Sequence, residues 1–112
     1  MCDYSNKKEE ELFRILDNVV LCCVTRYVDG TASLTRDDVL GRSRSEVVVM
    51  TRAILVQMII SAGYSTSTAA RLLNRDIHSI RHLVRLSQRL RKCSRAYRIA
   101  EEEAEKMCRK EG

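Results

Sequence analysis

The sequence has no proline and no tryptophan, and it contains one phenylalanine and only four glycines among 112 residues. This scarcity of helix-breaking and aromatic residues favours helices joined by short turns over a strand-rich sandwich or barrel. The length corresponds to one domain over residues 1–112, large enough to bury a modest core without disulfides or a structural metal. We therefore expect an all-α fold, in the form of a small helical bundle.

Cysteine pairs and catalytic motifs are also missing. The five cysteines are an odd number without Cys-x-x-Cys spacing, so we expect reduced thiols and a cytoplasmic protein. No Gly-x-x-x-x-Gly-Lys-Ser/Thr motif can hold a triphosphate, and no paired carboxylates or activated nucleophile can be identified. His78 and His82 have metal-ligand spacing, but Ser79 stands where a zinc hydrolase needs glutamate, and Arg81 and Arg85 would repel a cation. The prediction is no enzyme activity, no cofactor, no metal and no small-molecule substrate.

The chain also lacks a segment suited to a membrane. The polar run Ser5–Glu11 is incompatible with the apolar region of a signal peptide. The apolar run Val47–Ile60 contains Thr51, Arg52 and Gln57 and is too short to span a bilayer. No membrane association is expected.

Positive charge is concentrated in the middle of the chain. Residues 36–98 hold thirteen basic and four acidic side chains, a balance of +9, while the flanks hold seven basic and eleven acidic, a balance of −4. A basic centre indicates an anionic partner at a defined face. The alternative is a solvated arginine-rich helix face. Between positions 71 and 98 the only acid is Asp76, against nine basic residues: Arg71, Arg75, Arg81, Arg85, Arg89, Arg91, Lys92, Arg95 and Arg98.

Helical periodicity and capping residues divide the chain into three parts. A first helix is predicted over 7–28, followed by a region over 36–95 with a basic loop, a central helix and a helix-turn-helix, and then by a helical tail over 96–112. A short helix should end at Leu40, with Gly41 in the left-handed conformation. The central helix, from Glu46 to Ala62, is apolar nearly all round, so we expect it to be buried. The acidic run Glu101–Glu103 is interpreted as a solvated helix face.

The helix-turn-helix prediction depends on local signals around position 75. Residues 65–68 can cap a short helix that ends near Leu73, Asn74 suits the turn, and Asp76 is a good N-cap for a second helix. That helix should bury Ile80, Leu83, Val84 and Leu90 and place a basic side outward.

A basic second helix after such a turn is typical of small proteins that bind duplex DNA. Ile77, His78, Ser79 and Arg81 are expected to face base edges in the major groove. Arg42 and Arg44, on a loop of small residues, suit a narrow minor groove. Phosphate contacts are predicted for the following residues: Arg71, Arg75, Arg85, Arg89 and the helix cap at Thr66, Ser67 and Thr68.

The order of these elements resembles a known family. An Asp-Val-Leu-Gly-Arg-Ser-Arg run at 38–44 precedes Arg52 in a long apolar helix, and Leu-Asn-Arg-Asp-Ile-His-Ser-Ile-Arg-His follows at 73–82. This pattern is similar to the C-terminal DNA-binding domain of the bacterial replication initiator DnaA, of the Trp-repressor-like helix-turn-helix class. The resemblance covers residues 12–95, without the ATPase. It implies a stand-alone regulator that binds double-stranded DNA and associates with the nucleoid.

The family's Gly-Arg-Asp-His-Thr-Thr-Val motif can be carried over only in part. The resemblance implies that Arg44 enters the minor groove and that Asp76, in the Arg-Asp pair with Arg75, contacts a base edge. Ser79 matches the second threonine, Ile80 the buried valine and His82 a later histidine. Ile77 and His78 depart from the family at positions that contact bases, so the family's DNA site is not carried over, and Ile77 can pack on a thymine methyl instead.

A second interpretation is kept open. The apolar first helix and the acidic C-terminal helix could dock a protein partner or a second copy, so that the chain would be an adaptor without DNA binding. In that case the arginine face would be idle or would contact an acidic protein.

Overall fold

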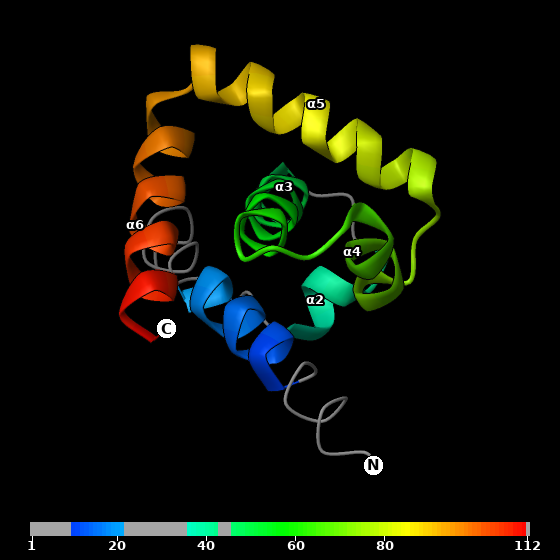
Figure 1. The fold of residues 1–112 in the computed structure, drawn as a ribbon. Coiled ribbons are helices and arrows are strands. Elements are labelled where there is room, and N and C mark those ends of the chain that lie inside the picture. The colour runs from blue at the N-terminus through cyan, green and yellow to red at the C-terminus, as the bar shows by residue number, and fades with distance from the viewer. Residues whose placement is uncertain (1–9, 22–35, 43–45, 112) are drawn as a thin grey trace.

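The computed structural model describes residues 10–21, 36–42 and 46–111, and every regular element in these ranges is a helix. The predicted all-α class is therefore confirmed. Residues 10–21 form the first helix; the later helices are α2 (Arg36–Leu40), α3 (Glu46–Ser61), α4 (Thr66–Leu73), α5 (Ile77–Cys93) and α6 (Arg95–Glu111) (Figure 1).

Helix α3 lies at the centre of the bundle. Residues 51–56, more than a full turn, are all buried, and α2, α4, α5 and α6 each pack against this helix (Figure 1). A helix with apolar residues on every side is stable only when neighbours cover every side, and this is the arrangement observed. The prediction of a buried central helix is confirmed.

The first helix packs on the core through Leu12, Ile15, Leu16 and Val19, which are buried at helical spacing. Helix formation is described over 10–21, inside the predicted range of 7–28, and the rest of that prediction lies outside the described residues. Arg36, at the start of α2, donates two hydrogen bonds to the carboxylate of Asp17 at 2.8 and 2.9 Å through Nη2. This exposed ion pair joins the first helix to α2.

Helices α3 and α4 each end in a left-handed residue. Gly63 has φ of 99°, and the amides of Gly63 and Tyr64 donate to the carbonyls of Ile60 and Ile59. The same pair of hydrogen bonds recurs around Asn74, at φ of 54°, so both ends are Schellman motifs. Glycine adopts this conformation without strain, and asparagine tolerates it.

The turn between α4 and α5 is short and capped on both sides. Ser65 caps α4 by accepting a hydrogen bond from the amide of Thr68, and Asp76 caps α5 through the amide of Ser79. Only residues 74–76 separate the two helices. These local contacts set the angle at which α5 leaves α4, and each of the capping residues was predicted.

The prediction that Gly41 ends α2 in the left-handed conformation is wrong. Among the described residues, positive φ occurs only at Gly63 and Asn74. Gly41 instead allows a close approach, because a Cβ at this position would lie 2.8 Å from the carbonyl oxygen of Asp37. The missing side chain therefore lets the turn after α2 fold tightly against the end of that helix.

Helix α6 belongs to the core and is not a peripheral tail. It turns back from α5 at Ser94, packs on α3 and α5, and buries Tyr97, Ala100 and Ala104 completely (Figure 1). Glu101 is also buried, with 8% of its surface exposed. The interpretation of Glu101–Glu103 as a solvated face is therefore wrong for Glu101, because this carboxylate accepts hydrogen bonds from Tyr97 and Arg91.

Candidate nucleic-acid interface

The N-terminal end of α5 is held by Asp76. Its carboxylate oxygen Oδ1 accepts a hydrogen bond from the amide of Ser79 at 2.8 Å. That bond, together with the hydroxyl of Ser79, lowers the pKa of Asp76 from its ordinary value. Asp76 therefore stays ionised near neutral pH and stabilises the first turn of α5. The base contact that the family resemblance implies for Asp76 remains a prediction.

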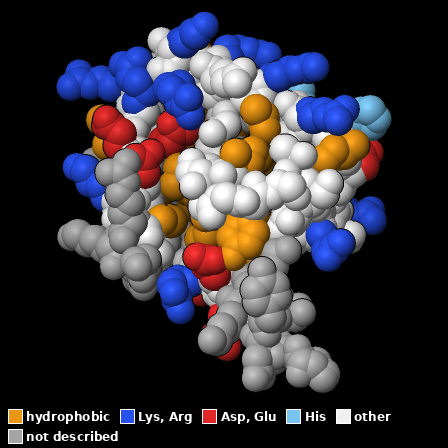
Figure 2. Space-filling view, viewed as in Figure 1, with side chains coloured by type: hydrophobic (Ala, Val, Ile, Leu, Met, Phe, Trp, Pro, Cys, Tyr) orange, Lys and Arg blue, Asp and Glu red, His pale blue; other side chains and the backbone are white. Residues whose placement is uncertain are grey.

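Helix α5 has one buried and one basic side. Ile80, Leu83 and Ser87 are buried, and the helix packs against α3. Ile77, Val84 and Leu90 are half-buried. Lysine and arginine side chains cover the outer edge of the molecule along α5 in Figure 2. The predicted contact residues on this side are all exposed: His78, Ser79, Arg81, His82, Arg85 and Arg89.

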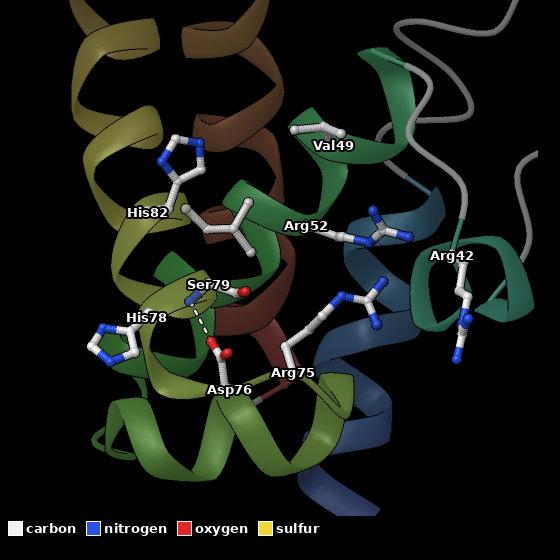
Figure 3. A pocket seen from close by; sticks show the side chains of 9 residues that line it. Arg42, Val49, Arg52, Arg75, Asp76, His78, Ser79 and His82 are labelled. Carbon is white, nitrogen blue, oxygen red and sulfur yellow. Dashed lines mark hydrogen bonds between the residues drawn. The ribbon is translucent and has the colours of Figure 1, made fainter.

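An open groove of about 830 Å³ lies beside the N-terminal end of α5. It joins the predicted minor-groove residue Arg42 to two of the predicted major-groove residues of α5, His78 and Ser79, while Ile77 and Arg81 do not line it (Figure 3). Arg44 lies outside the described residues. The loop arginine and the first turns of α5 thus share one surface, as the DNA-binding hypothesis requires. The residues that line the groove are Arg42, Val49, Arg52, Arg75, Asp76, His78, Ser79, His82 and Leu83.

Two arginines hold the turn after α2, one from α3 and one from the turn before α5. Arg52, on α3, donates through Nε to the carbonyl of Val39 and through Nη2 to the carbonyl of Gly41, both at 2.8 Å. Arg75 donates through Nη2 to the same Gly41 carbonyl and through Nη1 to that of Leu73 at 3.3 Å. Figure 3 shows the two guanidinium groups converging beside the turn that carries Arg42. We name this group of contacts the Gly41 clamp.

The Gly41 clamp also concentrates positive charge. Arg52 is only 5% exposed, and burial, followed by the charge of Arg75, lowers its pKa from the ordinary value. A guanidinium stays protonated in proteins, so both groups carry their charge. Arg75, predicted as a phosphate contact, is half-buried and already donates to two carbonyls. The geometry gives it a role in holding the loop, while the phosphate contact remains a prediction.

The residues predicted on α4 do not line the groove. Ser67 and Arg71 are exposed, whereas Thr66 and Thr68 are half-buried. The hydroxyl of Thr68 lies 3.2 Å from that of Ser65, within the cap of α4. Arg71 lies in the last turn of this helix, where its positive charge interacts favourably with the helix dipole. The phosphate contacts of these four residues remain a prediction.

Three groove residues were not predicted as site residues. Arg52 is a charged residue within an apolar helix. This pattern indicates that its guanidinium has a buried hydrogen-bonding partner, but it does not identify the partner. Val49 and Leu83 carry no signal of this kind, because apolar residues on a packed helix are expected whether or not a groove lies beside them.

Other kinds of site were also sought in the described ranges. Over residues 10–21, 36–42 and 46–111, no three histidine, cysteine or acidic side chains gather as metal ligands. None of the helices in these ranges combines the length and apolar character needed to cross a bilayer. No protein-family model, curated protein or solved structure matches this chain.

Proposed function

We propose that this protein binds double-stranded DNA through the N-terminal end of α5 and the turn that carries Arg42. The observation that supports the proposal is the shared groove, in which Arg42 lies on the same surface as His78, Ser79 and His82. In this proposal α4 and α5 form a helix-turn-helix, with α5 as the recognition helix. The turn after α2 then contributes a minor-groove contact.

Phosphate and base contacts are divided along α5. Asp76 and the first turn of α5 lie at the end that would approach base edges, beside the exposed His78, Ser79 and Arg81. Arg85 and Arg89 follow at four-residue steps on the exposed side, where they can neutralise phosphates flanking the groove. Arg71, exposed on α4, is proposed for the backbone on the other flank.

The resemblance to the DnaA C-terminal domain supports the same arrangement. Its match at Arg75, Asp76 and Ser79 falls at the turn before α5 and in the first turn of that helix. The departures at Ile77 and His78 fall there too. We therefore propose a sequence-specific regulator with a DNA site of its own, defined largely by these two side chains.

Selection from a random duplex pool tests the proposal directly. We expect enrichment of a defined site, together with an affinity that falls as salt is raised. Neutralisation of about four to six phosphates gives a slope of about −4 to −5 for log K against log salt. A flat salt profile, or no binding to any duplex at low salt, would overturn DNA binding as the function.

Arg81→Ala separates base recognition from general attraction. Arg81 is exposed near the start of α5, and its side chain bonds to no other described residue. We expect the change to weaken binding to the selected site by about tenfold or more, as loss of a base contact does, and to relax preference at one position. Lys106→Ala removes the same charge on α6 and serves as the matched control. If both variants behave like the wild type, the adaptor interpretation gains support.

A further inference from the structure

Basic side chains continue beyond the proposed base-contacting end, to the corner where α5 meets α6. Figure 2 shows lysine and arginine gathered over this corner, which is at the upper left in Figure 1. All four basic residues that we group as the corner surface are exposed: Arg89, Lys92, Arg95 and Arg98.

The charges of the corner surface lack acidic partners in the described part of the chain. Arg91, their neighbour, is paired with Glu101 at 2.8 Å, whereas Arg89, Lys92 and Arg95 form no ion pair there. Arg98 donates to the carbonyl of Arg91 at 3.1 Å. Like charges three and four residues apart destabilise a helix. A bound polyanion would relieve the repulsion between them.

The corner surface is held in a fixed position by buried contacts. The carboxylate of Glu101, on α6, accepts a hydrogen bond from the buried Tyr97 and two from Arg91 on α5. Gln57 on α3 donates to the hydroxyl of Ser87 at 2.8 Å beneath the same region. The basic side chains therefore project from a rigid corner.

The corner surface is too far from the base-contacting end to share its groove. Fifteen residues separate Ile77 from Lys92, and a helix rises 1.5 Å per residue, so the two lie about 22 Å apart along α5. The major groove is about 12 Å wide. With the first turns of α5 in that groove, Arg89 lies near the phosphates that border it, and Lys92, Arg95 and Arg98 lie beyond them.

We propose that the corner surface is a second DNA-binding surface, which contacts phosphates without recognising bases. The proposal rests on the proposed function, because it takes the first turns of α5 as the end that contacts bases. The phosphates can belong to the flank of the same duplex or to a second duplex. Either source offers the closely spaced negative charge that four exposed basic side chains fit.

The test compares two variants that remove two positive charges each. Lys92→Gln with Arg95→Gln changes the corner, and Lys106→Gln with Lys110→Gln is the control toward the C-terminal end of α6. Binding to the selected site within a long duplex is measured by fluorescence anisotropy over a salt series. We expect the corner variant to lose about two units of salt slope, to bind about tenfold or more weakly at low salt, and to keep its base preference.

Two further arms identify the source of the phosphates. If the flank supplies them, trimming the duplex to the selected site lowers the affinity of the wild type to that of the corner variant. If a second duplex supplies them, the wild type bound to an immobilised duplex captures a labelled second duplex, and the corner variant does not. The thermal midpoint of the corner variant should equal or exceed that of the wild type at low salt, because removing repulsion does not harm folding.

The outcomes separate this proposal from the proposed function. A corner variant that matches the wild type in affinity, salt slope and duplex capture overturns the second surface and leaves base recognition intact, even if the corner binds an acidic protein instead. If no site is enriched from the pool, sequence-specific recognition is contradicted. If the corner variant then still binds duplex DNA more weakly than the wild type, the second surface is supported. If the wild type binds no duplex at low salt, both proposals fall.

Discussion

Replacing Arg52 with methionine is expected to lower the free energy of unfolding by about 2–4 kcal/mol, because buried carbonyls lose their charged donor. The guanidinium bonds to the carbonyls of Asp38, Val39 and Gly41, at 3.3, 2.8 and 2.8 Å. Methionine fills most of the same volume but donates no hydrogen bond. Chemical denaturation of the variant and the wild type measures the difference.

The same change should also affect DNA binding, through Arg42. Without Arg52, the turn after α2 keeps only the bond from Arg75 to Gly41 in the Gly41 clamp. We expect Arg42 to lose its DNA contact when Arg52 is replaced. The effects of Arg52→Met and Arg42→Ala on the free energy of binding to the selected site should therefore be markedly non-additive. Independent contacts would add instead, within about 0.5 kcal/mol.

Arg52→Lys is the control for charge. Lysine keeps the positive charge but is a compact ammonium that cannot reproduce the planar fork of the guanidinium. We expect this variant to remain destabilised, since the contacts with Val39 and Gly41 need donors on two different nitrogens. A variant as stable as the wild type would show that charge alone holds the turn and would contradict the Gly41 clamp.

Local signals in the sequence correctly predicted the turn before α5. Ser65, Asn74 and Asp76 act within three or four residues of their own position, so their roles follow from residue type and spacing alone. The buried centre was predictable for a similar reason, because α3 is apolar on every side. These elements position the N-terminal end of α5, and so this side of the groove could be predicted from the sequence.

Contacts between distant residues could not be derived in the same way. Glu101 looked like one of three exposed acids, and only the return of α6 onto α5 and α3 buries it. Gly41 looked like a helix-ending glycine, whereas its backbone is used for close packing and for two arginine contacts. In both cases the role is set by a helix elsewhere in the chain, which short-range patterns do not specify.

Replacing Glu101 with leucine is expected to cost about 2–4 kcal/mol of stability. The carboxylate receives the hydroxyl of Tyr97 at 2.9 Å and the guanidinium of Arg91 at 2.8 and 3.1 Å. Its loss leaves the hydroxyl of a fully buried tyrosine without this acceptor. The double variant Tyr97→Phe with Glu101→Leu should be less destabilised than the two single changes predict together, because both polar partners are then removed. Simple additivity in denaturant melts would contradict this coupling.

Alkaline pH provides an independent test of the same contacts. Burial, followed by the charge of Glu101 and its hydrogen bond, raises the pKa of Tyr97 well above its ordinary value of about 10. The folded state therefore disfavours the phenolate. The stabilisation is fully present below pH 10, where the unfolded phenol is also neutral, and falls as the pH rises further. The loss contributed by Tyr97 approaches about 1.4 kcal/mol per pH unit. Between pH 9 and 11.5 the free energy of unfolding should therefore fall less steeply with pH for Tyr97→Phe than for the wild type. Equal slopes would show that Tyr97 ionises as easily in the folded protein as in the unfolded chain, in conflict with its buried position against Glu101.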